Sequence, residues 1–444
     1  MQIGNSLIEN SLKGHWLLGS TLDFASDTLG FVQRCIEEYP GGIVRTRIAF
    51  RDFFLLLKPE YITHVLQKNH RNYRKSFAYD GLKPFLGQGL LTSEGSHWLR
   101  QRRLAQPAFH REQLHTLIGD MAQATAIYLE SWQPGQTIHI HSEMGQLTQD
   151  IISRAVFGAT ADDLPEVDRI GGLLPVLRTY ANDRMKNPLM PPLWWPNRYN
   201  RRFRQTVEQL RTIVLRAIRL RRHAPRQDAT LLGMLMQAHT DEAMTDAQLY
   251  DEIVTIFIAG QETTTNAMGF LLLLLAQHPE AFARVAEEAT PVIAAGPDLH
   301  NVYQLQWTWQ VVQEALRMYP PAWAVSRQAI AADNIGGTTI PAGATAFLSV
   351  YAMHHHASYW EAPAEFRPER FAGDNYPKAA YLPFGAGPRK CIGSHFALLE
   401  MVIILAHLAV RFRLELKSDP QPKLITPMTM STRDPILFQL HTRS

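Results

Sequence analysis

One cysteine of this chain, Cys391, lies in a segment suited to thiolate chemistry. It belongs to the glycine-rich run Phe384–Gly393 (FGAGPRKCIG), follows Arg389 by two residues and precedes an apolar helical pattern. Glycines let backbone amides approach a sulfur atom closely, and a helix start offers unpaired N–H groups and a positive dipole. A nearby cation and a helix N-terminus both lower the pKa of a thiol. The segment therefore predicts a thiolate at Cys391, acting either as a nucleophile or as a metal ligand.

A second unusual segment, Ala259–Thr265 (AGQETTT), lies in the middle of a long helical pattern. This pattern begins with a capping box at Thr245 and ends at His278, before Pro279. A helix of about thirty residues is about 45 Å long. Glycine and β-branched residues weaken a helix, and a carboxylate in a buried helix is costly unless it is paired or hydrated. Such local conflicts predict either a functional site or a structural kink with hydrated polar groups.

Three weaker motifs combine charged groups or hydrogen-bond donors. Glu314 and Arg317 are three residues apart on one face of a predicted helix, a spacing that any surface helix can offer. Arg370, in the run FRPERF, could complete a buried, structural network of three charges. Trp98 and Arg102 are one helical turn apart and could bind a carboxylate or phosphate, or could belong to an ordinary surface helix.

The run His354–His356 is not expected to bind a metal ion. Adjacent residues of a regular element do not converge on one ion, and no cysteine or carboxylate spacing in the chain supports a zinc site.

The composition is that of an ordinary globular protein, with 46% hydrophobic and 19% charged residues. The net charge of +3 is too small to predict nucleic-acid binding, and two cysteines, Cys35 and Cys391, fit a reducing compartment. We recognise no secretory signal. The longest apolar run near any helix, Phe270–Ala276, is far shorter than the ~20 residues that cross a bilayer. We therefore expect a cytoplasmic chain with no membrane span.

Strand-like patches at both ends of the chain enclose a long stretch of helical periodicity. The patches are Gly42–Phe50, Phe53–Leu57, Asn334–Ile340 and Thr345–Val350. This order predicts one mainly α unit with small β-sheets (α+β) built from distant segments, and no domain boundary.

The segment Arg198–Arg226 carries ten arginines and a single acidic residue, Glu208. Its apolar residues form a helical stripe: Phe203, Val207, Leu210, Val214 and Ile218. The stripe predicts an amphipathic helix whose outer face is either solvated or binds a polyanion. The preceding segment, Asn187–Pro196 (NPLMPPLWWP), could be a mobile lid, a membrane-touching tip or a structured connection.

Together these motifs resemble the cytochrome P-450 family of haem-thiolate monooxygenases, over about Thr92 to Leu416 and in the family's order. The cysteine segment fills F-x-x-G-x-R-x-C-x-G, and AGQETT fits the oxygen-activation motif. Glu314 with Arg317 fits E-x-x-R, and Pro368–Phe371 fits P-E-R-F. The resemblance implies a single haem domain over residues 1–444, with a long central helix over a buried haem and no fused reductase.

The resemblance also implies roles for individual residues. Cys391 would be the iron ligand of haem b (iron protoporphyrin IX). Residues implied to bind the haem propionates are Trp98, Arg102, Arg327 and Arg389. Other residues implied to contact the cofactor are Ala259, Phe384 and Gly393. Thr263 would hydrogen-bond dioxygen and Glu262 would help supply protons, while the charges of Glu314, Arg317 and Arg370 would hold the protein core together.

The implied activity is hydroxylation, or epoxidation, of a hydrophobic substrate with dioxygen. Apolar residues would line the substrate pocket: Leu91, Ala259, Ala322, Trp323, Ala324 and Val325. A fatty acid is the favoured substrate, followed by terpenes, steroids and other lipophiles, and Arg51 lies near where some fatty-acid hydroxylases anchor a carboxylate.

The chain would receive electrons from NAD(P)H indirectly, through a ferredoxin or flavodoxin and its reductase. A basic docking patch could include Arg100, Arg102, Arg103 and Arg111, or these could be ordinary surface charges. Two alternatives are an enzyme of the same fold that uses or rearranges a peroxide, and a non-catalytic haem protein for sensing or carriage.

Overall fold

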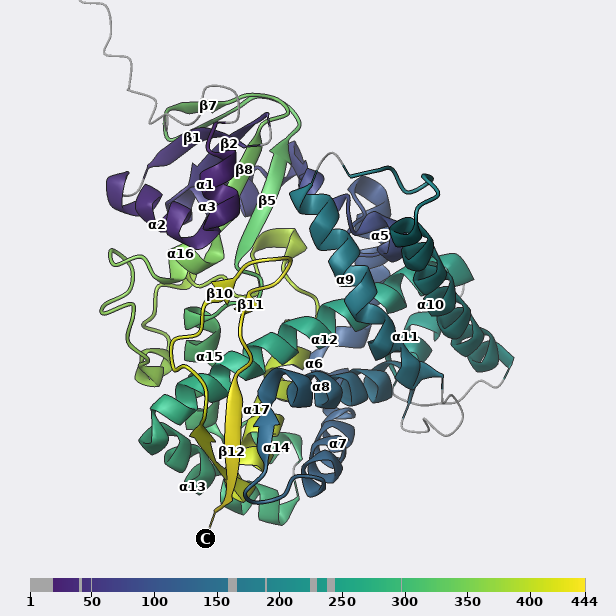
Figure 1. The fold of residues 1–444 in the computed structure, drawn as a ribbon, viewed down its shortest axis with the longest axis vertical. Helices are drawn as coiled ribbons and strands as arrows, with labels where there is room; N and C mark the ends of the chain where they lie inside the picture. Colours follow the sequence, from purple (N-terminus) through teal and green to yellow (C-terminus); the bar gives the residue numbers. More distant parts are fainter. Residues whose placement is uncertain are drawn as a thin grey trace, which may run out of the picture.

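The computed structural model describes residues 19–39, 42–48, 50–158, 166–187, 190–223, 230–237, 244–296 and 298–443. They form a mainly helical body with several small sheets, as the sequence predicted (Figure 1). Residues 188, 189 and 224–226, which belong to two of the predicted segments, lie outside the described residues.

The largest sheet has five strands in the order β1-β2-β8-β5-β3. Its strands are β1 (Ile43–Ile48), β2 (Arg51–Leu56), β3 (Tyr73–Lys75), β5 (Ala324–Ala329) and β8 (Thr345–Ser349). Strand β2 runs parallel to β8, whereas β5 is antiparallel to both β8 and β3. Strands β1, β2 and β8 confirm three of the four expected patches, and this sheet joins them, whereas the fourth patch, Asn334–Ile340, forms a separate strand pair.

Three smaller sheets complete the described strands. One has the order β4-β12-β9, and the other two are the pairs β6-β7 and β10-β11. Their bounds are β4 (Thr137–His139), β6 (Asp333–Ile335), β7 (Thr338–Ile340), β9 (Phe412–Leu416), β10 (Leu424–Ile425), β11 (Ser431–Thr432) and β12 (Leu437–Thr442).

The long central helix is α12 (Asp246–Gln277), which crosses the middle of the molecule (Figure 1). The predicted capping box is present: the Thr245 hydroxyl accepts from the backbone N–H of Gln248, whose side chain accepts from the backbone N–H of Thr245. Its 32 residues make a rod about 48 Å long. The helix is continuous through Ala259–Thr265, so a kink, one of the two alternatives for this segment, does not interrupt it.

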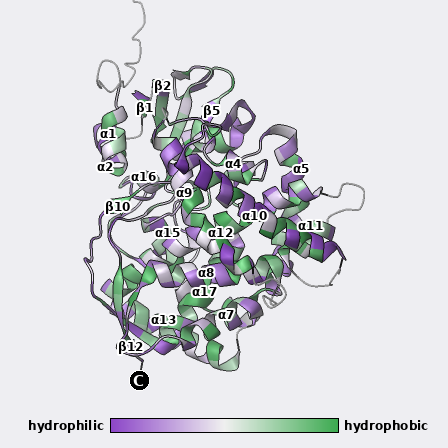
Figure 2. Ribbon diagram, turned by 45° about the vertical axis from the view of Figure 1, so that its right-hand side comes forward, coloured by the Kyte–Doolittle hydropathy of each residue, from purple (hydrophilic) through white to green (hydrophobic). Residues whose placement is uncertain are grey.

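Helix α12 packs against α8 (Ile140–Phe157), and α17 (Ser394–Arg411) packs against α7 (Ile118–Glu130) and α13 (Pro279–Ala295). Apolar residues concentrate along these central helices, and polar residues lie mostly at the periphery (Figure 2). The other α-helices are α1 (Thr21–Ser26), α2 (Thr28–Glu38), α3 (Pro59–Thr63), α4 (Lys83–Leu86), α5 (Gly95–Ala105), α6 (Arg111–His115), α9 (Ile170–Lys186), α10 (Arg198–His223), α11 (Leu231–Gln237), α14 (Leu299–Val302), α15 (Gln306–Met318) and α16 (Val350–His354).

By length and composition, one helix among the described residues could cross a membrane. This helix is α17, and 67% of its apolar window is buried inside the fold. Core helices of soluble proteins pass the same test, so the finding is weak evidence for a span.

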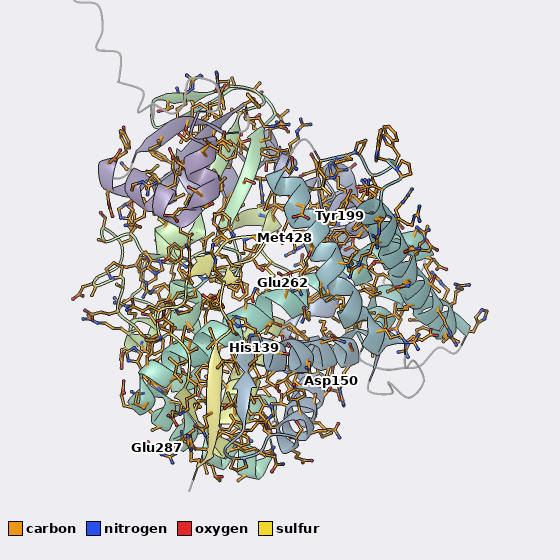
Figure 3. All side chains as sticks on the ribbon, viewed as in Figure 1. His139, Asp150, Tyr199, Glu262, Glu287 and Met428 are labelled. Carbon is orange, nitrogen blue, oxygen red and sulfur yellow. The ribbon has the colours of Figure 1, made fainter. Side chains whose placement is uncertain are left out.

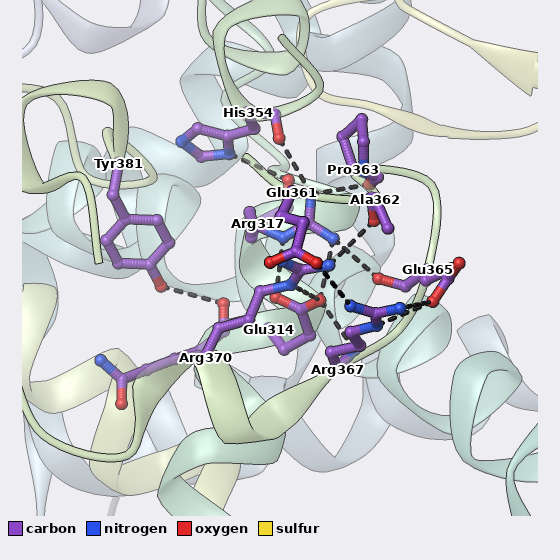
Figure 4. A network of polar contacts seen from close by, with 11 residues as sticks. Glu314, Arg317, His354, Glu361, Ala362, Pro363, Glu365, Arg367, Arg370 and Tyr381 are labelled. Atoms are coloured by element: carbon purple, nitrogen blue, oxygen red, sulfur yellow. Dashed lines mark hydrogen bonds and ion pairs between the residues drawn. The ribbon is translucent and has the colours of Figure 1, made fainter. Parts of the chain in front are cut away.

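The motif residues Glu314, Arg317 and Arg370 meet in a buried charge network (Figure 4). The Arg317 guanidinium donates to both carboxylate oxygens of Glu314, at 2.7 and 2.8 Å, and Arg370 Nε lies 3.3 Å from the same carboxylate. The backbone N–H of Arg367 donates to Glu314 as well, at 2.9 Å. The remaining Arg317 donors reach the carbonyls of His354, Pro363 and Glu365. This network joins α15 to the segment 354–370.

His354 is fully buried and serves the same part of the fold. Its Nδ1 lies 2.9 Å from the carbonyl oxygen of Arg317, and its Nε2 accepts from the backbone N–H of Leu382 at 2.8 Å. Burial lowers its pKa to about 3, so the ring is neutral. No group of three or more potential metal-ligating side chains occurs in the part of the chain that the structure describes.

Candidate active site

A cavity of about 390 Å³ lies in the middle of the molecule. Its wall includes the cysteine segment, the middle of α12, the start of strand β5 and one side of α5. Figure 3 shows Glu262 and Met428, both on this wall, near the centre of the structure. The cavity collects residues from Leu66 to Thr429, so it forms only in the complete fold.

The Cys391 loop is shaped by two glycines with positive φ, Gly385 at 68° and Gly387 at 71°. A Cβ on Gly387 would lie 1.9 Å from the carbonyl oxygen of Leu66, so no other residue fits there. The backbone N–H of Cys391 donates to the carbonyl of Phe384 at 2.9 Å, which closes the loop. This arrangement holds the thiol on the cavity wall three residues before α17.

The sequence-based expectation of a lowered thiol pKa is wrong for the chain by itself. Burial raises the pKa of Cys391, and this effect outweighs the lowering by the Gly393 N–H, Arg102 and Lys390. The exposed part of the Cys391 side chain faces the cavity. Protein surrounds the loop on its other sides, which explains why the thiolate form is poorly solvated. A coordinated cation deprotonates a thiol outright, so the site favours a metal ligand over a free nucleophile.

Four cations line the same cavity: Lys75, Arg102, Arg327 and Arg389. The Arg389 guanidinium donates to the carbonyl of Ser93 at 2.8 Å and to the carboxylate of Glu94, and it stacks 3.9 Å from the Trp98 ring centre. Burial lowers the pKa of Arg389 to about 10. Burial also lowers the pKa of Arg102, which the nearby Cys391 partly restores. Within the described residues, Glu94 is the one carboxylate that forms an ion pair with this group.

Lys75 was not recognised from the sequence. It lies directly opposite Arg327 in the β3–β5 pairing, and its ammonium group donates to the carbonyl of Leu91. Burial lowers the pKa of Lys75 well below its usual value, and Arg327 and Arg389 lower it further. Like charges opposite each other destabilise a sheet, so the pairing indicates a site for an anion. The pairing of Lys75 with Arg327 can be recognised only from the strand register, because β3 and β5 are about 250 residues apart in the sequence.

The α12 side of the cavity presents a hydroxyl group and a carboxylate. Thr263 donates to the carbonyl of Ala259 at 2.6 Å, one turn earlier, and Gly260 packs against Ile152 of α8. One Glu262 oxygen, Oε1, accepts from the Thr429 hydroxyl at 2.7 Å and lies 3.7 Å from an Arg178 nitrogen. The other oxygen, Oε2, is buried and has no hydrogen-bond partner in the described structure.

The remaining wall is largely apolar. Of the six predicted pocket residues, five line the cavity: Leu91, Ala259, Ala322, Ala324 and Val325. Trp323 does not line it; its indole N–H donates to the carbonyl of Pro427 at 3.2 Å, which directs the ring into the core. Arg51 also lies away from the cavity wall, with its guanidinium over the Phe77 ring. Wall residues not predicted from the sequence include Tyr79, Leu82, Leu86, Leu90, Leu231 and Ile256.

The loop Gly87–Thr92 brings Leu90 and Leu91 to this wall, and α12 holds it in place. The backbone N–H groups of Gln88 and Leu90 donate to the carboxylates of Asp251 and Glu252, at 2.7 and 3.0 Å. A Cβ on Gly89 would lie 2.1 Å from the Thr255 hydroxyl oxygen, so the loop approaches the helix as closely as backbone can. Burial raises the pKa of Glu252 to about 8, and its Oε1 has no partner among the described residues.

These features fit the expected haem. Its propionates would be held by the cationic group at Lys75, Arg102, Arg327 and Arg389, in which only Arg389 forms an ion pair with a carboxylate, that of Glu94, within the described residues. The Cys391 thiol would ligate the iron, and the apolar wall suits the flat macrocycle. All the other residues assigned to the cofactor also line this cavity: Trp98, Ala259, Phe384 and Gly393.

Comparisons with known proteins agree with this geometry. The family model described as Cytochrome P450 matches residues 10–440. Cyclooctat-9-en-7-ol 5-monooxygenase of Streptomyces melanosporofaciens is 34% identical over 405 residues, covering 90% of this chain and 87% of the relative. Cytochrome P450 4A24 of Sus scrofa is 30% identical over 440 residues, covering 93% and 86%.

Two solved structures share the whole fold. The cytochrome P450DA haem domain superimposes with a TM-score of 0.87 and 25% identity, covering 98% of both chains. Retinoic acid bound cyanobacterial CYP120A1 also gives a TM-score of 0.87, with 23% identity over 99% of this chain and 100% of that one. The chain therefore belongs to the cytochrome P450 family and is a haem-thiolate monooxygenase of that family.

Proposed function

We propose that this enzyme hydroxylates a lipophilic substrate and receives its electrons from separate redox proteins. The observation that carries the proposal is the meeting of three groups at one apolar cavity. These are the Cys391 thiol, the cationic group and the Glu262–Thr263 pair.

When bound, the haem supplies the iron chemistry that activates dioxygen, for which a thiolate ligand favours O–O cleavage. The protein supplies position and protons. The Cys391 loop fixes the sulfur through the Phe384 carbonyl and the glycine turn, and the cationic group would hold the haem propionates. Together these residues would set the position of the cofactor on the cavity wall.

Protons would come from the α12 side. The Thr263 hydroxyl donates to the Ala259 carbonyl, and the lone pairs of its oxygen can accept a hydrogen bond from a water molecule that carries the proton. Glu262 Oε2 has no hydrogen-bond partner among the described residues and so is available to a water molecule. Arg178 and Thr429 hold the other carboxylate oxygen and so set the direction of the side chain. An acid and a hydroxyl on successive residues suit the transfer of protons into an otherwise apolar site.

A fatty acid or a similar lipophile is the substrate class that we favour. Seven leucines line the cavity, which supports burial of a long apolar group. Terpenoids are the second candidate, because one relative is named for oxidising cyclooctat-9-en-7-ol and one structural neighbour holds retinoic acid. The absence of Arg51 from the cavity wall weakens the carboxylate-anchoring version of the fatty-acid proposal.

The redox partner that we propose is a ferredoxin or flavodoxin with its NAD(P)H-dependent reductase. Of the four arginines predicted for docking, Arg103 and Arg111 are exposed, whereas Arg102 lines the cavity. Arg111 is also engaged with Tyr303, to which it donates at 3.0 Å. Arg103 is therefore the best placed of the four for a salt-sensitive contact with an acidic partner.

The ligand assignment can be tested through Cys391→Ser. The reduced carbon monoxide complex of the wild-type protein should show the absorption band that identifies thiolate ligation, and the variant should lack it. Cys35→Ser, which changes a buried thiol elsewhere in the fold, should keep the band. A band that survived Cys391→Ser would overturn the assignment.

The reaction and substrate can be tested with a surrogate redox pair and a panel of fatty acids, terpenes and steroids. We expect spectral shifts and oxygenated products with one of the lipophilic classes. Turnover with peroxide alone, undiminished by Thr263→Ala and unresponsive to redox partners, would favour the peroxide-using alternative. NADPH consumption without product across the panel would favour a sensor or carrier.

A further inference from the structure

The helix that begins with α3 (Pro59–Thr63) ends in an unusually wide turn, η1 (His64–Lys68). The backbone N–H of Asn69 donates at 2.8 Å to the carbonyl of His64, five residues earlier, which is the hydrogen-bond pattern of a π-helix. The described residues contain no other π-helical turn. Such turns are rare and often occur at functional sites, so the place of this one in the fold needs an explanation.

The middle of the π-helical turn lies against the loop that carries Cys391. A Cβ on Gly387 would lie 1.9 Å from the carbonyl oxygen of Leu66 and 3.2 Å from Cγ of Gln67. The neighbouring Ala386 packs against the core cluster to which Leu66 belongs. Leu66 is itself buried and lines the cavity. The turn is therefore part of the surface that supports the cysteine loop.

One carboxylate holds both ends of the turn. Oδ2 of Asp333, at the start of β6, lies 2.9 Å from Nε2 of His64 and accepts from the side-chain amide of Asn69 at 3.0 Å. His64 and Asn69 are the same two residues that the π-type backbone hydrogen bond joins. Asp333 is 269 residues from His64 in the sequence, so this clamp exists only in the complete fold.

The Asp333 carboxylate is held in its charged form. Tyr73 also donates to Oδ2, at 2.7 Å, and Oδ1 accepts from the backbone N–H of Asn334 at 2.9 Å. Burial by itself would raise the pKa of Asp333, but the hydrogen bonds from Tyr73, His64 and Asn69 outweigh burial and lower it. Hydrogen bonds to a charged acceptor are stronger than those between neutral groups, so the clamp is a strong one.

We propose that Asp333 is a positioning residue for the Cys391 ligand, although it does not line the cavity. A π-helical turn holds one residue more than an α-helical turn. By keeping His64 and Asn69 in the wide turn, Asp333 places the Leu66 carbonyl against Gly387 and thereby sets the position of the cysteine loop. The inference rests on the assignment of Cys391 as the iron ligand in the proposed function.

The test compares two conservative variants, each of which removes one donor to Oδ2 of Asp333. Asn69→Leu removes the donor at the end of the π-helical turn, whereas Tyr73→Phe removes a donor on β3, outside the turn. If Asp333 only attached β6 to the rest of the fold, the two donors would be equivalent.

The haem-loaded proteins are reduced, bound to carbon monoxide and placed in mild denaturant, while the absorption band of the thiolate-ligated complex is followed. We expect this band to decay about tenfold faster in Asn69→Leu than in the wild-type protein, with absorption from a complex that lacks the thiolate replacing it. Tyr73→Phe should decay at the wild-type rate. Asp333→Asn, which removes the charge, should decay at least as fast as Asn69→Leu.

Hydrogen exchange of the amides of residues 384–391 is a second measurement that does not depend on the spectrum. The backbone N–H of Cys391, which donates to Phe384, should exchange faster in Asn69→Leu and at the wild-type rate in Tyr73→Phe. Unchanged exchange in Asn69→Leu would contradict the proposal.

Glu143 provides a control for a general loss of stability. At the start of α8, it accepts from the Tyr128 hydroxyl and the Trp132 indole N–H, both at 2.9 Å. Glu143→Gln should lower the free energy of unfolding but leave the decay of the thiolate band unchanged.

Two results would overturn the proposal alone: equal decay of the band in Asn69→Leu and Tyr73→Phe, or decay in Glu143→Gln as fast as in Asp333→Asn. A wild-type complex without the thiolate band would contradict the ligand assignment and this inference together. Failure of the positioning role and failure of the proposed function are therefore distinguishable.

Discussion

Two groups of buried charges in this molecule are built in opposite ways. In the Glu314 network, the carboxylate accepts from both arginines and a backbone N–H, and the donors of Arg317 also reach three carbonyls. At the cavity, four basic side chains gather, and the Arg389–Glu94 pair is the one ion pair that they form within the described residues. One buried oxygen of Glu262 on the cavity wall, and one of Glu252 behind the loop that carries Leu90, lack partners in the described structure.

The difference separates structural charges from functional ones. Burying an unpaired charge costs several kcal/mol on the usual scale, so a fold keeps one only where something else will meet it. The charges of the Glu314 network are all paired and need no ligand, whereas the charged groups at the cavity call for an anion and protons. Removing a member of the Glu314 network should therefore lower the stability of the fold, and neutralising a charge at the cavity should raise it.

The largest effect is expected from Glu314→Ala. This change leaves the fully buried Arg317 without its carboxylate and should cost about 3–5 kcal/mol of unfolding free energy. Chemical denaturation followed by circular dichroism measures it. As the control, Asp80→Ala removes one partner of the exposed Asp80–Lys83 pair and should cost less than about 1 kcal/mol. Equal losses of unfolding free energy in the two variants would show that the buried network is no more important to stability than an exposed ion pair.

At Glu252 the negative charge itself should destabilise the fold, whereas at Glu314 it stabilises the fold. Its pKa in the folded chain is about 8, above the ordinary value of 4.5, so the folded state binds more protons between these values. Stability should therefore fall as the pH rises from 4.5 to about 8. Glu252→Gln keeps an acceptor for the Leu90 N–H and should remove much of this fall, on the order of 3 kcal/mol at pH 9. Denaturation midpoints of both proteins across this pH range measure the effect; parallel curves would contradict it.

At the α12 wall, Glu262→Gln and Thr263→Val should each lower the rate of product formation about a hundredfold, because each removes a proton-transfer group. Substrate affinity should change little, since neither side chain is an apolar anchor. Steady-state kinetics separates kcat from KM. The control is Thr265→Val, because the Thr265 hydroxyl bonds to Thr148 of α8 at 2.9 Å and does not line the cavity.

The smallest effects are expected from Arg327→Gln, which should weaken haem binding but stabilise the haem-free chain. These opposite changes make it the most specific of the tests. Loss of a charged donor should speed haem release about tenfold. Removing the cation opposite Lys75 should also stabilise the haem-free chain by about 0.5 kcal/mol. Haem transfer to an acceptor protein and denaturation of the apoprotein measure these changes. The control is Arg74→Gln, in the paired strand β3, because Arg74 is hydrogen-bonded to Gln328 at the surface; it should do neither.

The parts of the fold that were predictable from sequence are those specified by local rules. The ends of α12 follow from the Thr245 capping box and Pro279, and the Glu314–Arg317 pair follows from helical spacing. Lys75 and Glu252 were missed because their roles arise from contacts with distant segments. Trp323 was wrongly assigned to the pocket for the same reason: its neighbours in sequence line the cavity, but its own ring packs in the core beside Pro427.

The cationic group also has a consequence for how the enzyme is made. Its members are far apart in the sequence, from Lys75 to Arg389, and the proposed iron ligand, Cys391, follows the last of them. During synthesis, most of the described helices therefore leave the ribosome before the residues proposed to hold the cofactor are all present. We expect haem to be loaded only after residues 389–391 have been made, and products truncated before Arg389 to remain colourless.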